Sequence, residues 1–211
     1  MKKESQVIFD KNVIEFVTVA AEFCAFLERA ESMKRSTFVD TTLKILPLLY
    51  LKASMLPKCE MIGDESPETY VTEEIYEVLR INLASILAEK DDYLEVFLPD
   101  MAYSDEPIKK NISEDLADIY QDIKDFIFVF QLGFNETMND SLAICQENFG
   151  LLWGQKLVNT MRALHDVKYS PKARGEDEEE EEYEPENNED CHCEDDDCHC
   201  HDHGCHCHDD E

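Results

Sequence analysis

The segment from Cys191 to His208 carries thiols and imidazoles, the side chains that bind soft and borderline metal ions. Thiolates and imidazoles are ligands of Zn²⁺, Ni²⁺ and copper, and a bound metal holds a thiol deprotonated. We therefore predict that this segment binds zinc or nickel, with copper as an alternative. The predicted ligands are Cys191, His192, Cys193, Cys198, His199, Cys200, His201, His203, Cys205, His206, Cys207 and His208.

These ligands follow a seven-residue repeat whose three units begin with Cys-His-Cys at Cys191, Cys198 and Cys205. In Cys-x-Cys the two sulfurs of an extended chain project to the same side, so both can reach one ion. Structural zinc sites more often use Cys-x-x-Cys, which makes this spacing closer to a metallothionein pattern. The twelve donors can hold at most three tetrahedral ions. The alternative is a low-complexity extension that binds metal incidentally.

Charge divides the chain near residues 170–175. The sequence has 49 acidic and 19 basic residues, and the part from Gly175 onward holds 19 of the acidic and none of the basic ones. Its seven consecutive acids, residues 176–182, repel one another and predict disorder. We expect a helical domain over residues 1–170, a disordered acidic linker over 171–190 and a metal-binding tail over 191–211. Nucleic acid and anionic membranes are not expected partners, because phosphate binding needs clustered cations.

The expected compartment is the cytoplasm. Two lysines near the N-terminus are followed by no apolar run, unlike a signal peptide, and no stretch approaches the roughly 20 apolar residues of a membrane span. Thiols would then be reduced, so the nine cysteines are ligands or core residues rather than disulfides. Cys24 and Cys145 lie on apolar faces and are expected to be buried. Cys59 lies in a loop, where a reactive thiol is the less favoured alternative.

Apolar residues recur with a helical period and show no convincing strict alternation, which predicts an all-α bundle of five to six helices. The first helix should start with Asp10 as N-cap and run to about residue 32. The second should lie between residue 36 and Pro57, with Pro47 bending it or dividing it in two. The third is expected from Thr72, the fourth from a Ser113 cap to Gly133, and the fifth over residues 135–165. Loops are expected at 58–69 and 100–111, and a short amphipathic piece at 93–98.

The apolar patterns also predict which side chains of these helices are buried. The third helix should bury a face that includes Val78, and the fifth a stripe that includes Leu152. Gly150 and Gly154, four residues apart, should leave a bare patch that a neighbouring helix can approach closely.

The helical part contains no catalytic motif, and an enzyme is the least supported class. Its single histidine, His165, follows Arg162 by three residues, so the Glu-x-x-His pair of di-iron bundles is missing. A polar pocket for a small anion or peptide is one hypothesis; the favoured alternative makes Trp153 a core residue and places Arg162 and His165 at a helix C-terminus, paired with carboxylates. The residues of that hypothesis are Asp91, Asp92, Tyr93, Trp153, Arg162, His165 and Asp166.

An acidic stripe follows the fourth predicted helix. It consists of Glu114, Asp115, Asp118, Asp122 and Asp125. A solvated face is the favoured interpretation of such a stripe, and a metal or partner site is the alternative. No cofactor is predicted for the helical domain.

The first 170 residues resemble one bacterial family. The similar stretches are residues 38–56, with Leu48-Leu49-Tyr50-Leu51 after Pro47, then Asp91-Asp92-Tyr93-Leu94, residues 112–130, Leu152-Trp153-Gly154 and residues 161–165. The family is the all-helical domain of unknown function 5063, common in gut Bacteroidetes, and the resemblance covers residues 7–170. It implies an all-helical cytoplasmic protein without an established activity, and it carries no functional residue over. The tail lies outside it.

These observations favour a metal-binding accessory protein, which would act as a buffer, store or chaperone for zinc, nickel or a related ion. Its helical domain would dock a client protein. The alternative is a helical protein-interaction module whose low-complexity tail is incidental.

Overall fold

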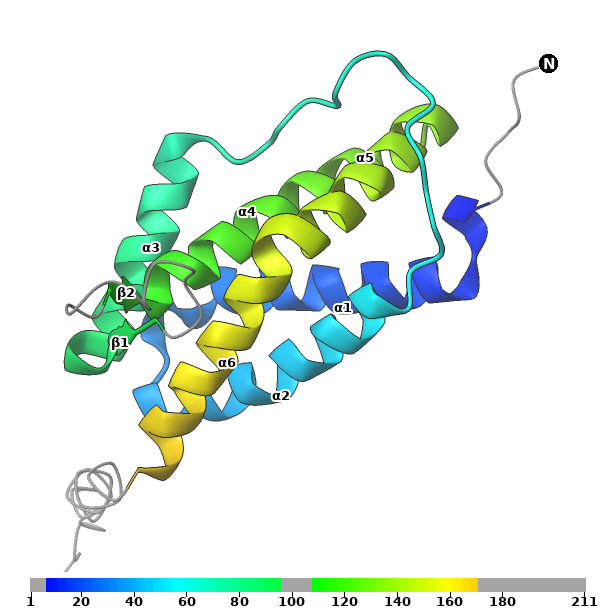
Figure 1. Ribbon diagram of the computed structural model, residues 1–211. Coiled ribbons are helices and arrows are strands. Elements are labelled where there is room, and N and C mark those ends of the chain that lie inside the picture. The colour runs from blue at the N-terminus through cyan, green and yellow to red at the C-terminus, as the bar shows by residue number, and fades with distance from the viewer. Residues whose placement is uncertain (1–6, 96–107, 171–211) are drawn as a thin grey trace, which may run out of the picture.

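A computed structural model describes residues 7–95 and 108–170, which form an all-α bundle (Figure 1). The predicted fold class is therefore confirmed. The helices are α1 (Lys11–Glu28), α2 (Arg35–Ser54), α3 (Glu73–Leu87), α4 (Ile112–Gln131), α5 (Asn135–Asn148) and α6 (Gly154–Tyr169). A π-helical turn, Phe149–Trp153, joins α5 to α6 without a break, so the long fifth helix that the sequence predicts exists and extends to Tyr169.

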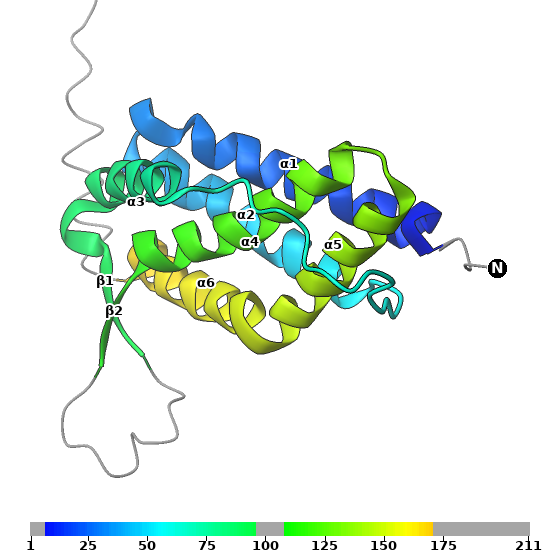
Figure 2. The ribbon, with the colours of Figure 1, turned by 90° about the horizontal axis from the view of Figure 1, so that it is seen from above.

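Helix α4 is the centre of the bundle. It packs against α1, α3, α5 and α6, and Figure 2 shows it running between them. Its apolar residues predict this position, because near residues 126–130 they cover the whole circumference of the helix. The residues predicted to be apolar contacts of α4 are all buried: Leu116, Ile119, Tyr120, Ile123, Phe126, Ile127 and Phe130.

Local signals set several helix ends as expected. The Asp10 carboxylate accepts a hydrogen bond from the Asn12 amide at 2.8 Å, and the Thr72 hydroxyl accepts one from the Ile75 amide at 3.3 Å. Gly133, with a φ of 78°, follows the end of α4, where a left-handed residue terminates a helix. Helix α2 continues through Pro47 as one helix, which settles the choice between one helix and two. The α-helical part of α1 ends at Glu28, before a short 3₁₀ turn, Ala30–Ser32.

The predicted cap of α4 is wrong. The helix begins at Ile112, and Ser113 is fully buried inside its first turn. The carboxylate of Asp91 takes the capping role: one oxygen accepts the Ser113 amide at 2.7 Å, and the other accepts the Ser113 hydroxyl at 2.6 Å. The Asp91 carbonyl also accepts the Ile112 amide at 2.8 Å. The cap comes from a residue 22 positions earlier, which a reading of neighbouring residues does not detect.

Two short strands replace part of the expected amphipathic piece and loop. Strand β1 (Asp92–Leu94) pairs antiparallel with β2 (Lys109–Asn111), with Tyr93 opposite Lys110. Three residues are too few to display the alternation that identifies a strand in sequence. The ribbon lies at one end of the bundle beside the start of α4 (Figure 2). The rest of the predicted piece and loop, residues 96–107, lies outside the described residues.

Two predicted burials and one predicted contact are also wrong. Val78 is 56% exposed, because α3 buries only a narrow stripe that includes Leu79 and Leu83. Leu152 is 52% exposed, because the π-helical turn inserts a residue and rotates the helix face. The two glycines, Gly150 and Gly154, do not admit a neighbouring helix. A Cβ at Gly150 would meet nothing within 4 Å, and one at Gly154 would overlap the Phe149 carbonyl of the π turn.

In the ranges 7–95 and 108–170, no helix is both long enough and apolar enough to cross a membrane.

Candidate functional site

The acidic stripe on α4 is not a solvated face. Asp115 is only 4% exposed, Asp118, Asp122 and Asp125 are half-buried, and each carboxylate bonds to a different element of the fold. Only Glu114 is exposed. The prediction of a solvated stripe is therefore wrong, because segments distant in sequence pack over this side of α4.

At the start of the stripe, two carboxylates hold tyrosines. The Tyr93 hydroxyl of β1 donates to Asp115, and the Tyr76 hydroxyl of α3 donates to Asp118 at 2.8 Å. Asp118 also pairs with Lys156 of α6. Burial raises the pKa of both tyrosines and of Asp115. These contacts fasten β1, α3 and α6 to α4.

Farther along α4, two carboxylates hold α5 and the segment before α3. The Asn148 side-chain amide donates to Asp122 at 2.6 Å. Asp125 accepts the backbone amides of Tyr70 and Val71 at 2.7 and 2.8 Å. Burial raises the pKa of Asp122 and of Asp125, and neighbouring carboxylates raise that of Asp122 further.

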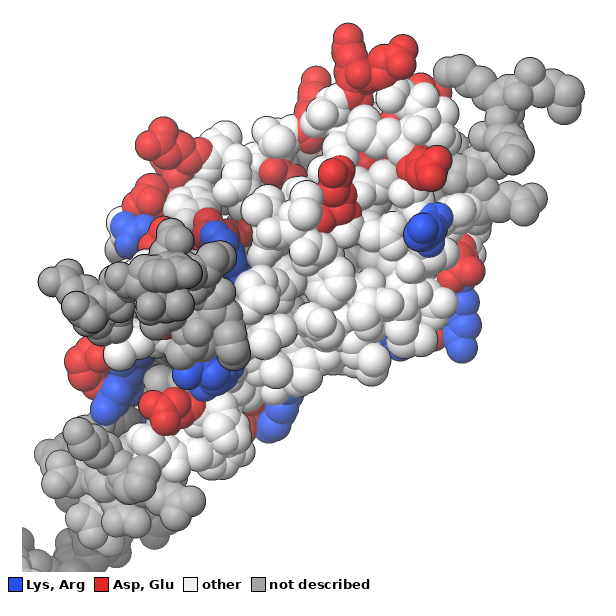
Figure 3. Space-filling view, viewed as in Figure 1, with Lys and Arg blue, Asp and Glu red and all other residues white. Residues whose placement is uncertain are grey.

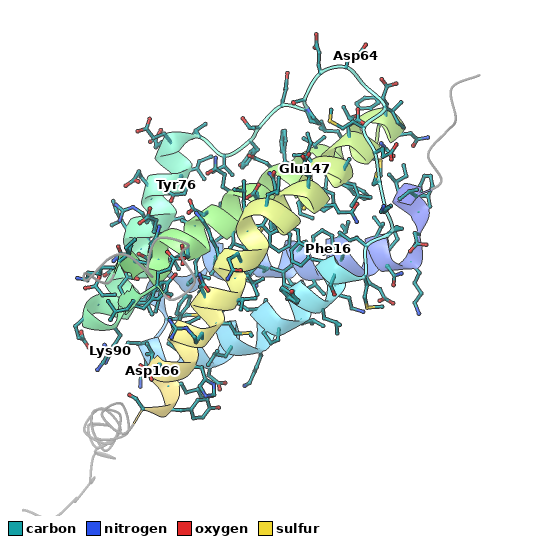
Figure 4. All side chains as sticks on the ribbon, viewed as in Figure 1. Phe16, Asp64, Tyr76, Lys90, Glu147 and Asp166 are labelled. Carbon is teal, nitrogen blue, oxygen red and sulfur yellow. The ribbon has the colours of Figure 1, made fainter. Side chains whose placement is uncertain are left out.

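The segment between α2 and α3 passes over α5 and α4 before it reaches α3 (Figures 1 and 2), and Asp64 marks a point on its way (Figure 4). Polar side chains of α5 hold it there. Asp140 accepts the amides of Ile62 and Gly63 at 2.6 and 2.9 Å, and the Asn139 side-chain amide donates to the Glu60 carbonyl at 2.8 Å. The segment is therefore fixed to the helices, although it has no secondary structure itself.

A cleft of about 410 Å³ lies between this segment and helices α4, α5 and α6. Its wall is mostly apolar and includes Phe126, Val129, Ile144 and Leu152. In Figure 3 the middle of this face of the molecule carries few charged side chains, and the Lys and Arg residues lie around its edges.

The charged residues that line the cleft are mainly acidic. Four of them are carboxylates, Glu68, Asp118, Asp122 and Asp125, and one, Lys156, is basic. Lys156 is already paired with Asp118. The cleft therefore combines an apolar wall with an excess of negative charge.

The polar pocket, the less favoured hypothesis, is not formed, and the contacts of Arg162 and His165 also differ from the carboxylate pairing of the favoured one. Arg162 donates to the Leu94 carbonyl of β1 at 2.8 Å, whereas His165 packs against the ring of Tyr169 with centroids 4.6 Å apart. Asp91 caps the start of α4, and the Tyr93 hydroxyl donates to Asp115 of α4. Trp153 is fully buried and donates to the Cys145 carbonyl at 3.1 Å, which confirms that it is a core residue.

The cysteines of the helical part are not activated. Cys24 and Cys145 are buried as predicted, and burial raises the pKa of Cys24 to about 12. Cys59 is half-buried with its sulfur 3.2 Å from the Asn139 side-chain oxygen, and burial raises its pKa as well. A nucleophilic thiol needs the opposite shift, so none of the three is a candidate nucleophile.

No group of three or more His, Cys, Asp or Glu side chains within residues 7–95 and 108–170 is placed to hold a metal ion. The twelve predicted ligands between Cys191 and His208 lie outside the described residues, as does the predicted linker.

The sequence interpretation missed the cleft. In the sequence, Asp122 and Asp125 stand out only as members of an acidic stripe, and nothing connects them with Asn148 or Leu152. The available signal was the position of Asp122 and Asp125 beside Ile123 and Phe126, at the border of the apolar face. That signal shows partial burial but does not identify the covering segment.

The comparisons with known proteins agree with the helical fold. A family model described as Domain of unknown function (DUF5063) matches residues 7–170. The crystal structure of protein BF1032 from Bacteroides fragilis is similar at 92% sequence identity, with a TM-score of 0.73, and the match covers 80% of this chain and 99% of that one. No curated protein matches the chain. The family match stops at residue 170, before the acidic linker and the repeats.

Proposed function

The chain belongs to the family described as domain of unknown function (DUF5063), and we propose that this member is a metal-binding accessory protein. It buffers, stores or delivers zinc, nickel or a related ion in the cytoplasm. The observation that carries this proposal is the three-fold Cys-His-Cys repeat, with twelve thiol and imidazole donors between Cys191 and His208. These are the donor types that zinc, nickel and copper prefer.

In this proposal the tail and the helical domain have different roles. The tail supplies the ligands, and the carboxylates around it raise the local concentration of cations without being soft ligands themselves. The helical domain, whose described residues hold no such ligand group, docks the client that gives or receives the ion.

Titration with Zn²⁺, Ni²⁺ and Cu⁺ tests the proposal. The full chain should bind up to three ions, and a variant that ends at Arg174 should bind none tightly. A full-length variant with all six tail cysteines changed to serine is the matched control for length and charge, and it should bind much more weakly. Bound metal should leave between pH 7.5 and pH 5, because protons compete for imidazoles with a pKa of about 6.5 and thiols with one of about 8.5. Equal stoichiometry in the full and truncated chains would contradict the proposal.

A second candidate function is a protein-interaction module, and exposed apolar side chains favour it. Leu151 of the π-helical turn is 70% exposed, and Leu48 and Leu51 of α2 are 44% and 51% exposed. The rings of Tyr50 and Phe149, 5.2 Å apart, join these two elements. A partner that binds the full and truncated chains equally, but not a Leu151→Glu variant, would support this function over the first.

A further inference from the structure

The cleft over α4 has the size and lining of a small-molecule site. Its volume of about 410 Å³ lies within the range of roughly 300–1,000 Å³ typical of ligand pockets. Such pockets are mostly apolar, with a few polar groups that orient the ligand. Here the side chains of Phe126, Val129, Ile144 and Leu152 supply the apolar wall, and the carboxylates of α4 supply the polar groups.

Asp122 is the half-buried carboxylate of the cleft whose charge is compensated by the fewest direct contacts. One of its oxygens accepts the Asn148 amide, and no described basic group forms an ion pair with it. Asp118 is different, because it is already bound by Tyr76 and Lys156. Asp125 also has one oxygen without a hydrogen bond, but its other oxygen accepts two backbone amides, which compensate more of its charge than the single amide of Asn148 does for Asp122. Lys156, which pairs directly with Asp118, offsets part of the charge of Asp122, but a half-buried carboxylate without a direct ion pair is still costly, and a bound cation would offset that cost.

We propose that the cleft binds a small organic cation with an apolar body, such as an arylalkyl primary amine. The ammonium group bonds to the free oxygen of Asp122, and the apolar body lies against Phe126, Ile144 and Leu152. Four carboxylates and only one lysine line the cleft, so electrostatic repulsion excludes organic anions from it.

The structure favours a small molecule over a metal ion or a peptide. The carboxylates of the cleft form no group placed to hold a metal in the described part of the chain. The segment over the cleft is held by Asp125 at one point and Asp140 at another, which limits the space for a longer ligand. This inference concerns the helical domain and does not depend on metal binding by the tail.

Isothermal titration calorimetry with phenethylamine tests the proposal on the full-length protein. Two compounds with the same phenylethyl body, the isosteric neutral 2-phenylethanol and the anionic 3-phenylpropanoate, separate the contribution of charge from that of the ring. Phenethylamine should bind with one site per chain, the alcohol at least tenfold more weakly, and the carboxylate not measurably.

Three variants locate the site. Asp122→Asn keeps the shape and an acceptor for Asn148, and it should weaken phenethylamine binding at least tenfold. Gln121→Lys places a cation at an exposed position on the wall of the cleft and should weaken binding similarly. Glu147→Gln is the matched control: it removes the same charge from an exposed residue of α5 that does not line the cleft, and binding should stay within twofold (Figure 4).

The outcomes decide the proposal. Absence of phenethylamine binding to the wild-type protein overturns it, as does equal binding of the amine and the alcohol. Equal losses in Asp122→Asn and Glu147→Gln would also overturn it, because they would show that the net charge of the protein, and not the cleft, attracts the cation. A circular dichroism spectrum of Asp122→Asn that matches the wild type shows that its loss of binding is local.

Discussion

At the scale of single residues, the carboxylates of this protein serve two opposite purposes. Asp91 is a buried carboxylate that completes the start of α4, with three hydrogen bonds to the first two residues of the helix when its carbonyl is included. Asp122, in contrast, has one hydrogen bond and no ion pair among the described residues. The first carboxylate stabilises the fold, whereas the second costs stability and leaves a group free to bind.

The substitution Asp91→Ala should destabilise the protein by about 2–4 kcal/mol. It removes a helix cap, worth about 1 kcal/mol, and leaves the buried Ser113 hydroxyl without a partner, which costs about 1–3 kcal/mol. Urea denaturation followed by circular dichroism measures the change. The matched control is Asp92→Ala, which removes an exposed ion pair with Lys109 and should cost less than about 1 kcal/mol. Equal effects of the two changes would contradict the capping role of Asp91.

The substitution Asp122→Asn should stabilise the protein near pH 7 and have little effect near pH 3. Burial raises the pKa of Asp122 in the folded protein. The native state therefore binds more protons than the unfolded state at pH values between the unfolded and folded pKa, and stability falls as the pH rises through that window. Asparagine has no such dependence. Denaturation of both proteins from pH 3 to pH 7 checks this. The stability advantage of Asp122→Asn over the wild type should grow as the pH rises, and an advantage that shrinks would contradict the prediction.

The contribution of Asp40 to the free energy of unfolding depends on pH in the opposite direction, because its pKa is lowered in the folded protein. Hydrogen bonds from Lys168 and Lys44 lower its pKa to about 2. The ionised Asp40 therefore stabilises the folded protein above the ordinary Asp pKa of about 3.9, and this stabilisation is lost as the pH falls toward 2. Because Lys168 lies on α6 and Asp40 on α2, acid weakens the contact between these two helices.

At the scale of elements, the π-helical turn decides how α5 and α6 present their faces. The Gly154 amide donates to the Phe149 carbonyl, five residues earlier, and the missing Cβ of Gly154 leaves room for that carbonyl. The extra residue puts Trp153 in the core and Leu152 in solvent beside the cleft. The wall of the cleft therefore depends on an irregularity within a continuous helix.

The substitution Gly154→Ala should destabilise the protein by about 1–3 kcal/mol. An added Cβ would lie 2.9 Å from the Phe149 ring and overlap the Phe149 carbonyl, and overpacking of this kind outweighs the higher helix propensity of alanine. Gly150→Ala is the matched control: its Cβ meets nothing within 4 Å, so alanine should stabilise the helix by about 0.5–1 kcal/mol. Thermal and urea denaturation compare the two. Stabilisation by both changes would show that the π turn does not require a glycine at 154.

At the scale of the whole molecule, the acidic charge is distributed unevenly along the chain. The part from Gly175 onward holds 19 of the 49 acidic residues and no basic ones, which leaves 30 acidic against 19 basic residues in the rest. Within the described residues, the core extends from Ile8 to Leu164. The family match to residues 7–170 covers the same part.

A chain that ends at Arg174 should fold as the full chain does. Its circular dichroism should show the same number of helical residues, and its melting temperature should equal or slightly exceed that of the full chain at low salt, because removal of like charges reduces repulsion. The difference should vanish in 1 M salt, where the Debye length is about 3 Å. A melting temperature lower by about 5 °C or more at both salt concentrations would show that the tail stabilises the helical domain.

The sequence by itself determined the features that depend on neighbouring residues. The helical period identified the helices, Asp10, Thr72 and Gly133 marked helix ends, and the apolar circumference of residues 126–130 placed α4 at the centre. The burial of Trp153 followed in the same way. The Cys-His-Cys repeats and their metal chemistry are likewise read from adjacent residues, and they remain a prediction.

Only the tertiary structure decided the features that depend on residues far apart in the chain. The capping of α4 by Asp91, the contacts of the acidic stripe with five other segments and the pairing of β1 with β2 each join positions separated by many residues. The cleft also belongs to this group, because a segment without secondary structure closes it over α4. Whether an aspartate faces water, caps a helix or lines a cavity is set by what packs over it, and the local sequence around Asp91 or Asp122 does not contain that information.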